Sequence, residues 1–252
     1  MILLNINNSM QSLYQNMSSL KRISSAKDDP AGMAISQKMK SQTDGYETSI
    51  NNIDNMNNLN KVAQGGLSSI NSSLQRIREL SLQASNGILS DGDKNSIQGE
   101  ITQLKEGISE VSKNTQFNTI NLLDGNFEDK SVASNPDGTG RTISIGDFSL
   151  EGLGISDLDV TKDFDIGIID NALSKVSSAQ GKLGATYNSL NSNSNYNSVA
   201  RENIAAANSR IEDLDIGEQI TKLNTKNLLQ QVQYQMQQKQ MDNEVNKIDM
   251  LL

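Results

Sequence analysis

Apolar residues recur every three or four positions toward both ends of this 252-residue chain, but not in its middle. The two striped segments run from residue 30 to 84 and from 169 to 252, in sequence otherwise rich in Asn and Ser. A helix with one apolar stripe is not stable alone in water, because its stripe must be buried against a partner. The natural partner of each end is the other end, followed by other copies of the chain. The pattern predicts a mainly α-helical protein, an elongated antiparallel bundle or coiled coil formed by both ends, with a small β-hairpin region between them.

The composition excludes several classes of function. The chain has no Cys and no His, so thiolate metal sites and the commonest general base are both missing. We therefore expect no enzyme activity, no metal and no cofactor. The formal net charge of −8 disfavours nucleic-acid binding. No run of about 18 apolar residues exists, so we expect no membrane insertion.

Two helices are predicted in the first third of the chain. The shorter one is indicated by apolar residues at spacings of three and four: Met10, Leu13, Met17, Leu20 and Ile23. Asp29 followed by Pro30 predicts the start of the second, which extends to Ala84 with its seam beginning at Ile35. From Ile50 to Ala84 the mean step is 34 residues over ten intervals, about 3.4, near the period of a coiled coil. Gly65 and Gly66 each cost this helix about 1 kcal/mol relative to Ala, which packing must offset.

The remaining segments divide into helix, hairpin and helix. A third helix is predicted from the caps at 90–93 to about residue 113. One or two β-hairpins are expected within 126–165, with a strand at 142–145 whose alternation continues to Phe148 and Leu150. The acidic residues from 157 to 170 indicate a solvated strand edge rather than a calcium loop. The second stripe has a polar gap at 191–197, where a helix must rely on its neighbours, and it closes with Met241, Val245, Ile248 and Leu252.

Residues 74–83 form the densest unusual stretch of the chain. Leu80 lies on the seam, whereas the charged residues lie toward its flanks and Leu82 adds an apolar group outside it. One reading is a solvated helix face with local ion pairs, each worth little. The other is a docking face for a neighbouring subunit. The pattern leaves both open for Gln75, Arg76, Arg78, Glu79, Leu80 and Leu82.

Six sequence blocks, in order, resemble bacterial flagellin. They are SAKDDPAGMAIS at 25–36, LQRIRELSLQ at 74–83, SIQGEI at 96–101, NTQFN at 114–118 followed by Leu122 and Leu123, SRIED at 209–213, and the terminal Leu251 and Leu252. The similarity covers everything except roughly 126–165. It implies a subunit that polymerises into the flagellar filament for motility, after unfolded export through the flagellar type III apparatus. A secreted protein located in the bacterial flagellum is therefore expected.

The resemblance also implies a division of the chain. Residues 1–25 and 213–252 correspond to the two halves of an inner coiled-coil domain, 26–125 and 166–212 to the helices of a rod domain, and 126–165 to the β-hairpin region. In the family's typical pattern about a dozen more residues precede the Asp28-Asp29 block, so the N-terminal half is shortened here and the inner coiled coil is expected to be lopsided. The terminal seam then consists of Met10, Leu13, Met17, Leu20, Met241, Val245, Ile248 and Leu252.

Partners follow from the same resemblance. They are further copies of the chain, an export chaperone, hook-associated and cap proteins, and the flagellin-sensing Toll-like receptor. Arg76, Leu80 and Glu100 match receptor-contacting positions, and Glu100 joins the 74–83 stretch in one contact face.

Other identities remain as alternatives. A hook–filament junction protein shares the two-ended helical plan, and a coiled-coil adaptor would be a stable folded monomer or dimer at low concentration. A protease-bearing flagellin would need an HExxH motif, and the chain has no His. For a flagellin we predict that residues 1–25 and 213–252 order only on assembly, because their stripes lack partners in the isolated chain.

Overall fold

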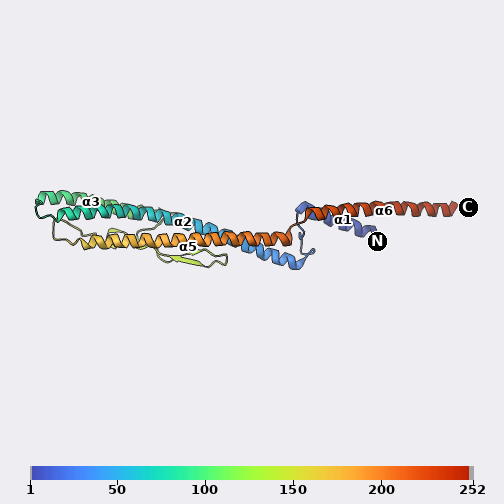
Figure 1. Ribbon diagram of the computed structural model, residues 1–252, viewed down its shortest axis with the longest axis horizontal. Coiled ribbons are helices and arrows are strands. Elements are labelled where there is room, and N and C mark those ends of the chain that lie inside the picture. Colours follow the sequence, from blue (N-terminus) through green and yellow to red (C-terminus); the bar gives the residue numbers. More distant parts are fainter. Residues whose placement is uncertain (1, 250–252) are drawn as a thin grey trace. The chain divides into compact units, whose positions relative to one another are not determined.

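A computed structural model of the protein describes residues 2–249, and the side chains of residues 10–245. The elements in chain order are α1 (Ile2–Ser19), α2 (Pro30–Ala84), α3 (Asp91–Asn114), β1 (Gln116–Phe117), β2 (Ile120–Asn121), β3 (Lys130–Ala133), β4 (Gly140–Ile143), α4 (Leu150–Leu153), α5 (Gly167–Glu212) and α6 (Ile216–Asp249). The chain forms two compact units. We call residues 1–43 with 202–252 the terminal unit, and residues 44–201 the central unit. The predicted mainly α fold with a small β region is confirmed (Figure 1).

Helix α2 has the bounds that the sequence predicts. The Asp29 carboxylate accepts a hydrogen bond of 2.9 Å from the Gly32 backbone N–H, which makes Asp29 the N-cap and Pro30 the first helical residue. Helix α3 begins at the predicted caps too: Ser90 and Asp93 form a reciprocal capping box.

The apolar core of the central unit lies along α2. Its stripe from Ile53 to Ala84 is buried against α3, α5 and the intervening loops, and the three helices run alongside one another (Figure 1). The seam prediction is wrong at Ile35, whose side chain is 47% exposed. Gly66 allows a close approach, because a Cβ there would lie 2.7 Å from both Leu123 and Thr115, whereas nothing lies within 4 Å of a Cβ at Gly65.

Two small antiparallel strand pairs flank the core. β1 pairs with β2 outside the expected 126–165 range, and β3 pairs with β4 inside it. The prediction that a strand continues through Phe148 and Leu150 is wrong, because Ser149 caps α4 and Leu150 is its first residue. Residues 157–166 contain no strand either. Their backbone follows turns, and Lys105 of α3 holds it by donating hydrogen bonds to the Ser156 and Leu158 carbonyls.

The polar segment at 191–197 is helical and lies within α5. The side-chain amides of Asn193 and Asn197 both donate to the Ser134 carbonyl beside β3, at 3.2 and 2.9 Å. Earlier in the same helix, the side-chain amide of Asn60 of α2 donates to the Leu183 carbonyl at 2.8 Å. The expectation that this helix relies on its neighbours is confirmed, since hydrogen bonds replace apolar burial there.

In the terminal unit, α1 and α6 lie side by side (Figure 1). Leu214, just before α6, donates its backbone N–H to the Leu20 carbonyl just after α1, at 3.2 Å. Because this contact joins the end of α1 to the start of α6, the two helices run antiparallel. α1 has 18 residues and α6 has 34.

Candidate assembly surfaces

The face predicted at residues 74–83 carries a set of ion pairs in the central unit. Arg76 of α2 binds Glu100 of α3, with the Arg76 Nε and the Glu100 Oε1 2.8 Å apart, and its Nη1 lies 3.2 Å from Glu79. Arg78 binds Asp170 of α5 at 2.6 Å. These carboxylates raise the pKa of both guanidinium groups. All five side chains are part-exposed, so solvent and salt screen the pairs.

Leu80 does not belong to the exposed part of this face. Its side chain is 2% exposed and packs in the core of the central unit, because it follows the seam periodicity of α2. Leu82 is 48% exposed and Gln75 is exposed as well. The available face is therefore Gln75, Arg76, Arg78, Glu79, Leu82 and Glu100, and its charges are already paired within the chain.

The predicted terminal seam is buried at only one of its described positions. Leu13 is buried, Met10 and Met17 are half-buried, and Leu20 is exposed at the end of α1 with a φ of 54°. Met241 and Val245 are both exposed on α6. The side chain of Ile248 and the whole of Leu252 lie outside the described residues.

Helix α6 exposes apolar side chains over most of its length. Those exposed are Ile216, Ile220, Leu228, Leu229, Val232, Tyr234, Met236, Met241 and Val245. An amphipathic helix normally buries such a stripe. This is a surface that contact with further chains would cover.

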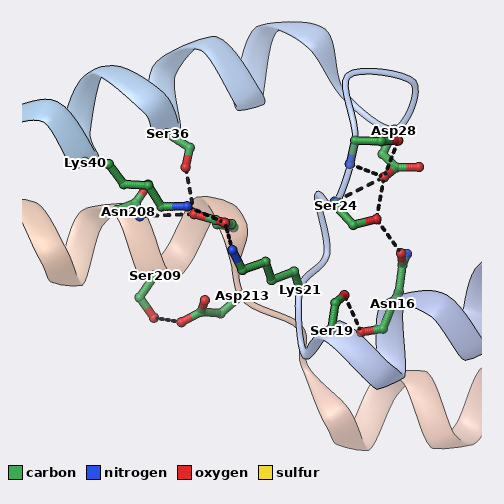
Figure 2. Close-up of polar contacts among 12 residues, drawn as sticks. Asn16, Ser19, Lys21, Ser24, Asp28, Ser36, Lys40, Asn208, Ser209 and Asp213 are labelled. Atoms are coloured by element: carbon green, nitrogen blue, oxygen red, sulfur yellow. Dashed lines mark hydrogen bonds and ion pairs between the residues drawn. The ribbon is translucent and has the colours of Figure 1, made fainter.

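A buried carboxylate that sequence reasoning missed organises the start of the terminal unit. Glu212, the last residue of α5, has a side chain only 8% exposed. It lies 2.6 Å from the Nζ of Lys21 and 2.7 Å from that of Lys40, and it accepts hydrogen bonds from Ser36 at 2.8 Å and Asn208 at 3.2 Å (Figure 2). The two lysines lower the pKa of Glu212 to about 2. A carboxylate at a helix C-terminus opposes the macrodipole, and that position is the sequence signal that could have indicated cationic partners.

Backbone contacts join the same region. The N–H of Arg22 donates to the Glu212 carbonyl at 2.7 Å, and Lys21 bridges Asp213 in an antiparallel pair. Beside it, the Asp28 carboxylate accepts from the backbone N–H and hydroxyl of both Ser24 and Ser25 (Figure 2). These hydrogen bonds lower the pKa of Asp28. The linker from α1 to α2 is thus held by local hydrogen bonds at one end and by Glu212 at the other.

Other kinds of site are not found in the described part of the chain. No three or more acidic side chains gather there closely enough to hold a metal ion. Within residues 2–249, no helix combines the length and the apolar character that a membrane crossing needs.

Paired terminal helices that leave apolar side chains uncovered are typical of structural proteins that self-assemble. Residues 2–128 match the bacterial flagellin N-terminal helical region and residues 166–248 match the bacterial flagellin C-terminal helical region, so the chain belongs to the bacterial flagellin family. Bacterial flagellin is a family of structural proteins.

Individual relatives agree with this assignment. The chain is 34% identical over 264 residues to the flagellin of Bacillus subtilis (strain 168), covering 89% of this chain and 87% of the relative. It is 34% identical over 235 residues to the flagellar filament core protein flaB2 of Brachyspira hyodysenteriae, with 85% and 82% coverage. The crystal structure of Bacillus cereus flagellin superimposes with a TM-score of 0.53 and 25% identity, covering 58% of this chain and 88% of that one.

Proposed function

We propose that this chain is a structural subunit of the bacterial flagellar filament and polymerises with further copies of itself. Family membership supports a filament subunit. The observation that carries self-assembly is the exposed apolar surface of α6, which α1 leaves uncovered along most of its length. Burying such side chains gives roughly 25 cal/mol per Å², so repeated contacts between copies supply a large driving force.

Polymerisation is tested on the purified full chain by concentrating it and imaging the product by electron microscopy. We expect long filaments, together with a sedimenting fraction that grows with concentration. Deleting residues 248–252 should abolish the filaments while the central unit keeps its helical circular dichroism. Long filaments from the truncated chain would refute this use of the terminal seam.

Two alternatives predict different products in the same experiment. A hook–filament junction protein would form only short collars. A coiled-coil adaptor would remain a compact monomer or dimer at every concentration, and hydrogen exchange would be uniformly slow in both terminal segments of the dilute chain.

Export and extracellular location are part of the proposal. We propose that the chain is exported unfolded by the flagellar type III apparatus with an export chaperone, and is placed in the filament next to hook-associated and cap proteins. The family resemblance supports this route. Secretion should stop when the flagellar export apparatus of the producing cell is inactivated, which an immunoblot of the culture medium measures.

We also propose recognition by the flagellin-sensing Toll-like receptor through Arg76 and Glu100. Both side chains are part-exposed on adjacent helices and are bonded to each other. Leu80 is buried in the core of the central unit and is not available for a contact. Soluble subunit should activate a receptor reporter cell and Arg76→Ala should weaken that response, whereas an inert wild-type subunit would contradict the proposal.

A further inference from the structure

The methionines with described side chains differ sharply in exposure. Met56 is 5% exposed, and Met10, Met17, Met33 and Met39 are intermediate. Met236 and Met241 stand apart at 58% and 62%, and both lie on α6. Exposure controls how fast an oxidant reaches a thioether sulfur. Among the methionines with described side chains, Met236 and Met241 are therefore the ones that an oxidant in solution reaches first.

No other type of side chain in this sequence competes effectively with the thioethers for a mild oxidant. With no Cys and no Trp in the sequence, the thioethers are the most readily oxidised side chains. Hydrogen peroxide transfers one oxygen atom to the sulfur. The thioether becomes a sulfoxide, and the rest of the peroxide leaves as water. The sulfur loses two electrons and the peroxide bond gains them. A methionine sulfoxide reductase, with a thiol as reductant, reverses the change.

The two methionines are parts of small apolar patches on the helix surface. Val232 lies four residues before Met236, and Val245 lies four residues after Met241, so each pair shares one side of α6. Both valines are exposed. A sulfoxide places a strongly polar S=O group inside such a patch, and burying that group without a donor opposes association.

We propose that Met236 and Met241 are reversible oxidation sites, and that their oxidation by peroxide blocks incorporation of the subunit into a polymer. This inference rests on the proposed function, because it needs α6 to be covered by further copies of the chain. The sites are open in the free subunit and closed in the polymer. Peroxide thus acts on subunits that have not yet assembled and spares those that have.

The test uses the full chain, and each variant is compared with its own untreated form. Dilute subunit is treated with a low concentration of hydrogen peroxide, and oxygen uptake at each methionine is followed by peptide mass spectrometry. We expect Met236 and Met241 to react about fivefold faster than Met56. The concentration needed for sedimentable polymer should rise about tenfold after oxidation. Incubation with methionine sulfoxide reductase should restore it.

Two variants separate these sites from the other methionines. Leu resembles Met in volume and helix propensity and does not oxidise, so Met236→Leu with Met241→Leu should make polymerisation insensitive to peroxide. The matched control, Met33→Leu with Met39→Leu, should stay as sensitive as the wild type. Polymer treated with peroxide should retain unmodified Met236 and Met241.

Different failures have different meanings. If the untreated wild type and both variants polymerise, but peroxide affects the Met236→Leu, Met241→Leu chain as strongly as the wild type, the inference is wrong and the proposed function stands. If oxidised wild type polymerises normally, the inference is likewise wrong and the proposed function stands. If no untreated chain polymerises at any concentration, the proposed function fails and the inference falls with it.

Discussion

Replacing Glu212 with Gln removes one negative charge from the centre of the hydrogen-bonded cluster in the terminal unit. The amide has the same shape and can still accept a hydrogen bond from Ser36, so no cavity opens. What is lost is the charge that faces Lys21 and Lys40 at 2.6 and 2.7 Å. Glu212 is almost fully buried but the lysines are part-exposed, so the lysines stay hydrated and the cost is the loss of their attraction to the buried carboxylate.

The stability that the Glu212 charge contributes can be worked out from its pKa. Bonding to Lys21 and Lys40 lowers the pKa of Glu212 from 4.5 to about 2, and a fall of about 2.5 corresponds to roughly 3.4 kcal/mol. The lysines are 43% and 47% exposed, so screening reduces this to about 2 kcal/mol. Since the folded-state pKa is the lower one, this stability is fully present above pH 4.5 and is lost as the pH falls toward 2.

Hydrogen exchange measures this loss locally in the assembled chain, where both terminal segments are expected to be ordered, at the amides of Arg22 and Leu214, whose partners lie beside the cluster. At neutral pH their protection factors should fall about 30-fold in Glu212→Gln, the equivalent of 2 kcal/mol. Wild-type protection should also fall between pH 4.5 and 2, whereas that of the variant should not. The matched control is Glu218→Gln, which removes an exposed partner of Lys222 and should change little. Unchanged protection in Glu212→Gln, or an equal loss in the control, would refute the reasoning.

Three further substitutions test the central unit. Gly65→Ala should raise the free energy of unfolding in urea by about 1 kcal/mol, whereas Gly66→Ala should lower it by about 2 kcal/mol. The difference arises because only the Cβ at residue 66 meets neighbouring atoms. A gain in stability in both variants would contradict the packing. Asn197→Ala should lower the free energy of unfolding by about 1 kcal/mol and speed amide exchange in β3 and β4, since one donor to the Ser134 carbonyl is lost. Unchanged exchange would show that this hydrogen bond is not needed. Arg78→Ala should leave the urea curve nearly unchanged, because its ion pair is solvated, yet reduce sedimentable polymer; normal polymer would remove Arg78 from the contact face.

The helices could be predicted from the sequence because their signals are local. Asp29 and Pro30 fix the start of α2 within two residues, and the stripe that follows specifies one buried side over many turns. The same periodicity places Leu80 in the core, where the structure has it. The family resemblance instead assigned Leu80 to a surface contact, which its spacing contradicts.

The β region was predicted less well because alternation reports burial and not backbone pairing. Ile145 and Phe148 are buried as the pattern suggests, yet their backbone N–H groups bond to the Phe127 and Leu123 carbonyls in loops. The position of Glu212 at a helix C-terminus indicates that it needs cationic partners, but local patterns do not identify those partners. Lys40 and Ser36 are 172 and 176 residues away from it, so only the fold brings them together.

The paired bonds from Asn193 and Asn197 to the Ser134 carbonyl have a consequence for how the central unit comes apart. This stretch of α5 has few apolar side chains, so its hydrogen bonds to the β3–β4 hairpin hold it in place. The two should melt as one cooperative foldon. A protease that cuts the turn between β3 and β4 would then destabilise α5, although it cleaves no peptide bond in that helix.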